Sequence, residues 1–163
     1  ILKKREAFRT AFASFIPEAV AAFTDQDRER LMQDAGIVRN KRKIDAAITN
    51  ARAVIALRGA LAAEADAHCA GRMGEAPLRH LLRPRQSYPR HLGELVWLYQ
   101  PNQQPRPRCA QEVPAQTEES RALSLELKRR GFVFVGPVTA LALMSAIGIV
   151  NTDILGTWKR PSN

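Results

Sequence analysis

Residues 128–140 read KRRGFVFVGPVTA, and this stretch joins the two segments with the clearest helix signals in the chain. The first segment begins at Thr117, a candidate N-cap, and ends in three basic residues that suit the negative end of a helix dipole. Gly131 fits the left-handed position that closes a helix. Gly136 followed by Pro137 is typical of the next helix start, because proline's fixed φ suits the first turn. The stretch therefore predicts a tight hairpin between two helices.

The hairpin has the features of a phosphate-binding device. Backbone N–H groups at a glycine turn and at a helix N-terminus attract an anion, although Pro137 removes one of these donors. Lys128, Arg129 and Arg130 add positive charge beside the turn. The helix that follows, to Gly148, is apolar almost all round, so we expect it to be buried.

Length and composition favour one helical domain with a polyanionic partner. The chain has 163 residues, of which 45% are hydrophobic and 6% aromatic. Its 25 Lys and Arg outnumber 16 Asp and Glu, for a net charge of +9 and a pI near 10.4. Such a charge favours binding to a polyanion, although a basic protein without such a partner remains an alternative.

Four further segments have helical periodicity. They are residues 3–15, 17–23, a third helix from Thr24 to Gly36 that buries Leu31 and Met32, and a long helix with Ile44, Ile48, Ala51 and Ile55 on one stripe. Residues 92–99 add a short core helix or turn. No segment alternates long enough to predict a sheet, so we expect an all-α fold.

Two basic or irregular segments interrupt these helices. The cluster Arg39, Lys41, Arg42 and Lys43 could meet a phosphate backbone or form a solvated basic turn. Residues 59–91 contain three prolines and no sustained periodicity. They predict an insertion within a single domain, helical up to His68 and otherwise a mobile loop.

Cysteine and histidine spacing predicts neither disulfides nor a metal site. Cys69 and Cys109 lie far apart without a CxxC pair, which favours a reducing, cytoplasmic compartment. The His and Cys residues at 68, 69, 80 and 91 match no ordinary zinc spacing. No apolar run reaches the roughly 18 residues of a membrane span, so we expect no membrane partner. The chain opens on Ile1 rather than Met, and we expect it to be part of a longer protein.

Four ordered segments resemble one family. The run from Phe134 to Ala140 is similar to the GVGxxTA hairpin of helix-hairpin-helix DNA repair glycosylases, with Phe134 in place of the first glycine. Residues 1–9, 34–44, 113–120 and 127–136 together resemble the DNA-3-methyladenine glycosylase I family. The resemblance covers roughly residues 1–58 and 92–158.

The resemblance implies base-excision repair of alkylated purines such as 3-methyladenine in duplex DNA, by a monomer associated with the nucleoid. It implies a helix-hairpin-helix fold that is incomplete at the N-terminus. The DNA-binding residues that we expect are Lys128, Arg129, Arg130, Gly131, Val135 and Gly136. In the family, the catalytic glutamate and the stacking aromatic residues precede the segment matched at residues 1–9. We therefore expect no catalytic residue here, and a chain that holds DNA but is inactive alone.

The resemblance also bears on metal binding and on a second carboxylate. Asp153 and Thr157 occupy the positions of the family's zinc ligands, and threonine is a poor ligand, so we expect no zinc and no other cofactor. Many helix-hairpin-helix glycosylases have a catalytic aspartate where this chain has Asn151. Asp153 is the nearby carboxylate, and we expect it to be a turn or cap residue.

Two alternatives to the glycosylase interpretation remain open. The chain could be a non-catalytic helix-hairpin-helix module that binds DNA. It could also be a helical protein–protein interaction domain in which the basic hairpin is incidental.

Overall fold

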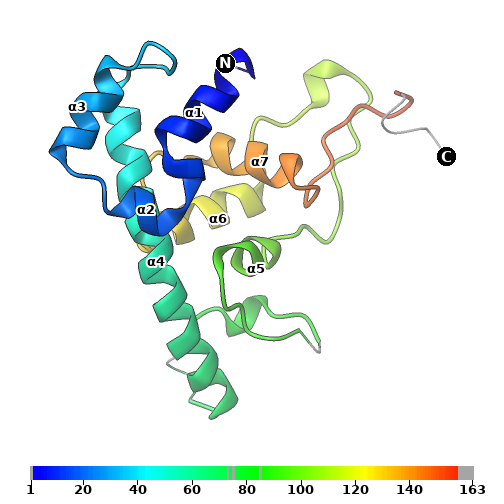
Figure 1. The fold of residues 1–163 in the computed structure, drawn as a ribbon. Coiled ribbons are helices and arrows are strands. Elements are labelled where there is room, and N and C mark those ends of the chain that lie inside the picture. The colour runs from blue at the N-terminus through cyan, green and yellow to red at the C-terminus, as the bar shows by residue number, and fades with distance from the viewer. Residues whose placement is uncertain (1, 73, 75, 85, 158–163) are drawn as a thin grey trace.

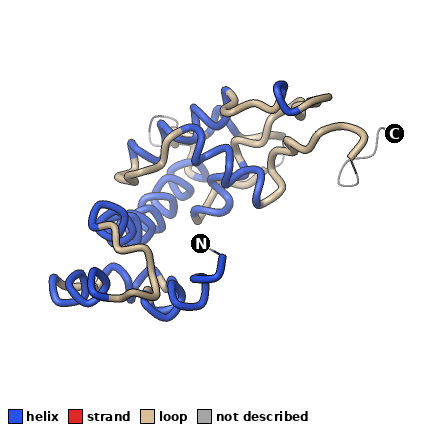
Figure 2. Tube along the Cα trace, turned by 90° about the horizontal axis from the view of Figure 1, so that it is seen from above, coloured by secondary structure: helices blue, strands red, loops and turns tan. Residues whose placement is uncertain are grey.

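The computed structural model describes residues 2–72, 74, 76–84 and 86–157, and within these ranges it contains helices and loops but no strand (Figure 2). The all-α prediction is confirmed. The α-helices are α1 (Arg5–Ala11), α2 (Pro17–Ala21), α3 (Asp25–Gln33), α4 (Lys41–Cys69), α5 (Leu92–Trp97), α6 (Glu118–Arg129) and α7 (Pro137–Ala146). Short 3-10 turns cover Leu2–Lys4, Ala13–Phe15, Arg79–Leu81 and Ala110–Glu112.

The long helix α4 is the element that the others pack against. Its start is capped by Asn40, whose side-chain oxygen accepts a hydrogen bond from the Lys43 N–H at 3.1 Å. One buried cluster joins α1, α2 and α3 to the first half of α4. A second cluster joins the later part of α4 to α5, α6 and α7. In Figure 1, α1–α3 lie beside the first half of α4, and α5 lies farther along it.

α4 is also the one described helix that is long and apolar enough to cross a membrane, by length and composition alone. We expected no such stretch, because the longest apolar run, around Val138 to Val150, is broken by Ser145 and Gly148. Most of the buried side chains of α4, including Ile48 and Leu61, belong to the two core clusters. A central core helix needs the same composition, so these contacts account for it without a bilayer.

The predicted helix over residues 3–15 is broken. α1 ends at Ala11, and Ala13, Ser14 and Phe15 have φ angles of 48°, 57° and 58° in the left-handed region. Such angles are unfavourable for residues with a Cβ, so surrounding contacts must impose them. Phe12 supplies such contacts, because its ring is buried in the first cluster and stacks against Phe8 at 6.1 Å. The reversal leaves Phe15 on the surface.

Residues 59–91 cover the second cluster. α4 runs without interruption through Gly59 to Cys69, slightly past the predicted end at His68. The chain then folds back, and the side chains of Ala76, Leu78 and Tyr88 are buried in the second cluster. The Tyr88 hydroxyl donates a hydrogen bond to Glu64 of α4 at 2.7 Å and accepts one from the Leu78 N–H at 3.1 Å. A single domain with a flexible insertion at residues 59–91 stays a prediction.

The burial predicted for some apolar residues is wrong. Within the described residues, only one side of α7 is covered, and Val138, Leu143 and Ile147 are 60%, 40% and 43% exposed. Met32 and Ile55 are likewise exposed. Apolar character alone therefore overestimated the core, because a helix buries only the faces for which the fold supplies neighbours.

Candidate nucleic-acid interface

The predicted helix ends on both sides of the hairpin are confirmed. Gly131 has a φ of 87°, and its N–H donates to the Lys128 carbonyl at 3.0 Å. The Phe132 N–H donates to the Leu127 carbonyl at 3.0 Å. This pair of bonds is the Schellman arrangement, and the buried side chains of Phe132 and Leu127 belong to one cluster. Gly136 is the N-cap of α7.

Two side chains hold the hairpin in place between α4 and α6. The Asn50 side chain of α4 accepts from the Val133 N–H at 2.8 Å and donates to the Val133 carbonyl at 3.1 Å. The Ser124 hydroxyl of α6, which is 1% exposed, donates to the Val135 carbonyl at 2.6 Å. The hairpin backbone is thus bonded to both neighbouring helices.

These bonds leave one set of backbone donors available. In the described residues, no acceptor lies within hydrogen-bond reach of the N–H groups of Phe134, Val135, Gly136, Val138 and Thr139. All five residues are exposed or partly exposed. They belong to the hairpin turn and the first turn of α7, where the helix dipole is positive. Together they can bind an anion such as phosphate.

Gly136 leaves open space beside these donors. Its φ of −72° is accessible to any residue, so the turn itself does not require glycine. A Cβ built at this position would meet no atom of the described chain within 4 Å. The missing side chain therefore leaves room for a ligand to approach the hairpin backbone from solvent.

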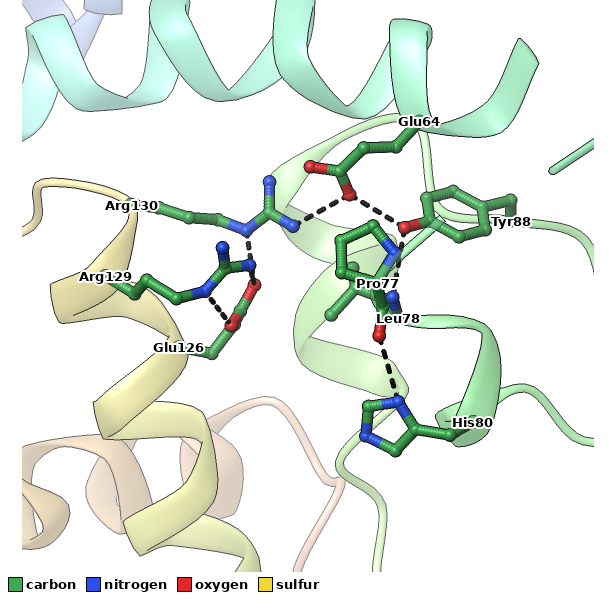
Figure 3. A network of polar contacts seen from close by, with 8 residues as sticks. All are labelled: Glu64, Pro77, Leu78, His80, Tyr88, Glu126, Arg129 and Arg130. Atoms are coloured by element: carbon green, nitrogen blue, oxygen red, sulfur yellow. Dashed lines mark hydrogen bonds and ion pairs between the residues drawn. The ribbon is translucent and has the colours of Figure 1, made fainter. Parts of the chain in front are cut away.

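The three basic residues expected to bind DNA have different surroundings, and Figure 3 shows two of them, Arg129 and Arg130. The Arg130 side chain is 6% exposed and points inward, bonded to Glu64 of α4 at 2.9 Å and to Glu126 at 2.5 Å. Arg129 is 57% exposed and also pairs with Glu126, at 2.7 Å. Lys128 is exposed, with no carboxylate within 4.0 Å among the described residues.

This network perturbs the ionisation of its members. Burial acts to raise the pKa of Glu126, but hydrogen bonds from Arg129 and Arg130 outweigh it and bring the pKa below its ordinary value. Burial acts to lower the pKa of Arg130, and the bonds from Glu64 and Glu126 reverse that effect. Burial and the Glu64 carboxylate raise the pKa of Tyr88. The charged forms of the ion pairs are therefore favoured at neutral pH.

The structure divides the six predicted DNA-binding residues into two groups. Val135 and Gly136 offer backbone donors, and Lys128 lies nearby in sequence with an exposed charge. Arg129 and Arg130 pair with Glu126, Arg130 also links α6 to α4, and the Gly131 N–H closes α6. Asn50 and Ser124 were missed, although a polar residue beside the apolar stripe of α4, or between Leu123 and Leu127 in α6, is a recognisable signal for a buried hydrogen bond.

An apolar cleft of about 320 Å³ lies beside the hairpin. Its walls come from Phe12, the Ala13–Phe15 turn, the hairpin, and helices α2, α4, α5, α6 and α7. Its lining residues are Phe12, Phe15, Pro17, Val20, Ala47, Asn50, Ala51, Val54, Leu92, Leu127, Phe132, Val135 and Leu143. A cleft of this size and composition can receive an aromatic base or an apolar segment. None of these lining residues can serve as an acid or base.

The segment after α7 forms a side-chain-bonded turn. The Asn151 side chain accepts from the Asp153 N–H at 2.9 Å, and the backbone N–H of Asn151 donates to the Gln104 side chain at 2.8 Å. The first bond is an Asx-type turn. No group of three His, Cys, Asp or Glu side chains that could hold a metal occurs in the described part of the chain. The absence of zinc at Asp153 and Thr157 stays a prediction.

Comparison with known proteins identifies the family. A family model described as methyladenine glycosylase matches residues 1–89 and 79–160. The chain belongs to the methyladenine glycosylase family. It is 37% identical over 166 residues to DNA-3-methyladenine glycosylase 1 of Escherichia coli (strain K12), covering 100% of this chain and 73% of that protein. It is 32% identical over 157 residues to DNA-3-methyladenine glycosylase of Haemophilus influenzae, covering 94% of this chain and 69% of that protein.

Solved structures agree with this assignment. A crystal structure of 3-methyladenine DNA glycosylase I superposes with a TM-score of 0.73 at 33% identity, over 98% of this chain and 74% of the other. A glutamate-to-glutamine variant of the Staphylococcus aureus enzyme gives a TM-score of 0.73 at 26% identity, over 99% and 73%. The fold and the enzyme class are therefore those of DNA repair glycosylases.

The family match also corrects the extent of the resemblance. Both matched ranges run into residues 59–91, which we had set outside it, and the Escherichia coli relative aligns with the whole chain. The family match therefore includes the segment around Tyr88, and the flexible insertion at residues 59–91 stays a prediction.

Proposed function

We propose that this chain holds duplex DNA for hydrolysis of the N-glycosidic bond of an alkylated purine such as 3-methyladenine. The observation that carries the proposal is the row of N–H donors from Phe134 to Thr139, which have no acceptor in the described part of the chain, in a member of this family. One relative has been solved in complex with 3-methyladenine, which supports a methylated purine as the substrate base. We further propose that the chain acts as a monomer, in the cytoplasm.

The chemistry of the hairpin suits a DNA backbone. Phosphodiesters accept hydrogen bonds from backbone N–H groups at helix N-termini, and such contacts position a protein without reading sequence. The net charge of +9 adds a sequence-independent attraction. The apolar cleft beside the hairpin suits a base that has left the stack, and Phe15 on its rim offers an aromatic surface.

Substitution of Gly136 tests the role of the hairpin. We expect Gly136→Ser to weaken duplex binding several-fold, because the new side chain enters the space through which the DNA backbone approaches. The fold should be kept, since serine is a preferred N-cap and its Cβ meets no atom of the chain. The measurement is fluorescence anisotropy with a labelled duplex, together with the thermal midpoint of each protein.

The control is Gly59→Ala. Gly59 is exposed in α4 and likewise has open space around its Cβ position. This change should raise stability by about 1 kcal/mol through helix propensity and leave DNA binding unchanged. Equal DNA affinities for the wild-type protein and a folded Gly136→Ser protein would reject the hairpin as the DNA contact.

A further inference from the structure

The basic residues that precede and begin α4 are not explained by the helix itself. Arg39, Arg42 and Lys43, which we call the α4 basic edge, are all exposed. Cations at a helix N-terminus oppose the helix dipole, so stability of α4 does not account for them. Within the described residues, no carboxylate lies within 4.0 Å of any of the three.

Lys41, in the middle of the same segment, has a different environment. Its ammonium pairs with Asp45 at 2.8 Å, and Arg28 approaches the same carboxylate at 3.2 Å. The charge of Lys41 is therefore compensated within the protein, whereas those of the α4 basic edge have no such carboxylate among the described residues.

Arg42 contacts the hairpin directly. Its guanidinium carbon lies 5.6 Å from the centre of the Phe134 ring, a cation–π distance. Arg42 and Asn50 are eight residues apart, about two turns, so they share one face of α4. Asn50 binds Val133 while Arg42 contacts Phe134, so the hairpin runs along this face of the helix.

Phe134 is presented to Arg42 by an unusual backbone. Its φ is 59°, in the left-handed region, and its side chain is 54% exposed. An exposed aromatic ring in this conformation gains little from burial. Its cation–π contact can instead hold the Arg42 guanidinium in place. Stacking orders the arginine while its N–H edge stays free, so less entropy is lost when a phosphate binds.

We propose that Arg42 binds a DNA phosphate next to the one bound by the hairpin N–H groups. The Phe134 N–H is one of those donors, so the cation and the donors belong to one surface. The α4 basic edge then extends the DNA contact from the hairpin onto the N-terminal half of the molecule. This inference rests on the proposed DNA-holding function.

The test compares the salt dependence of duplex binding by Arg42→Ala, Arg42→Gln and Lys41→Ala. Each lost phosphate contact lowers the slope of log K against log salt by about 0.9. Both Arg42 variants should show this decrease and bind several-fold more weakly. Lys41→Ala removes the same charge one residue away, but its slope should match the wild-type slope because Asp45 compensates Lys41. Thermal midpoints of all three variants should stay near that of the wild type.

The outcomes separate this inference from the proposed function. If both Arg42 variants keep the wild-type slope while Gly136→Ser weakens binding, Arg42 has no phosphate contact and the hairpin remains the DNA site. Equal decreases for Lys41→Ala and Arg42→Ala would also overturn the inference, because general charge would then explain them. A wild-type chain that binds no duplex would overturn both proposals.

Discussion

At the scale of single residues, Asn50 is the side chain on which the hairpin most depends. Its amide accepts a hydrogen bond from the Val133 N–H and donates one to the Val133 carbonyl, as the backbone of a paired β-strand would do. Its two partner groups lie 83 residues away in sequence. Asn50 therefore determines where the donor groups of the hairpin stand relative to α4 and its basic residues.

Replacement of Asn50 should affect stability and DNA binding together. We expect Asn50→Ala to cost about 1–2 kcal/mol in the free energy of unfolding, because two backbone groups lose their partner. DNA affinity should fall without a change in salt slope, since no charge is removed. Urea unfolding and anisotropy measure the two effects.

Asn102→Ala is the matched control, since Asn102 is exposed and makes no hydrogen bond in the described part of the chain. It should change neither quantity. A fall in stability with unchanged DNA affinity for Asn50→Ala would mean that the hairpin does not need this anchor in order to bind.

At the scale of the elements, one buried ion network joins α4, α6 and the segment around Tyr88. Arg130 lies between Glu64 and Glu126, and Glu64 also accepts a hydrogen bond from the Tyr88 hydroxyl (Figure 3). A buried guanidinium with one partner removed is costly, so the network specifies how α6 ends against α4. The hairpin begins at the next residue, and its position follows from this contact.

The pH dependence of stability should report this network. The pKa of Glu126 is lower in the folded protein than its ordinary value of 4.5, so its contribution to stability is present above that value. The contribution is lost as the pH falls below about 4.5 and through the folded pKa. Wild-type protein should therefore lose more stability than Glu126→Gln between about pH 6 and pH 3.5.

The measurement is the free energy of unfolding by urea across this range. Glu112→Gln is a suitable control, because Glu112 is exposed and lies outside the ion network. Parallel curves for wild type and Glu126→Gln would show that the network does not stabilise the ionised carboxylate.

At the scale of the whole molecule, the DNA-contacting features and the cleft have opposite character. The hairpin and the α4 basic edge carry donors and uncompensated cations, while the cleft beside them is apolar with Asn50 as its polar member. Hydrolysis of a glycosidic bond calls for a carboxylate or another group that stabilises the cationic sugar. No such group lines the cleft among the described residues.

We accordingly expect the 163-residue chain to bind alkylated duplex DNA without releasing methylated adenine. Release is measured by chromatography of the free base, with the Escherichia coli relative as the positive control. Release above the uncatalysed rate would show that this chain contains a catalytic group. Asp153→Asn would then be the first variant to examine, because Asp153 follows α7 closely.

Local signals in the sequence were sufficient for the secondary structure around the hairpin. The Thr117 side chain accepts from the Ser120 N–H at 3.2 Å, and the Gly131 N–H donates to Lys128 at 3.0 Å. Each of these contacts spans three residues, so the chain carries its own information about where α6 begins and ends. The four ordered motifs likewise sufficed for the family.

Only the tertiary structure decided which residues of the site face outward. Arg130 and Arg129 are adjacent cations in the sequence. Arg130 is buried because it pairs with Glu64, which lies 66 residues away. Phe134 and Arg42 meet through the same long-range packing of the hairpin on α4. Burial and ion pairing depend on neighbours that are distant in sequence, whereas helix caps depend on neighbours within one turn. The sequence therefore determined the hairpin, and the packing of α4 determined which of its groups remain available for DNA.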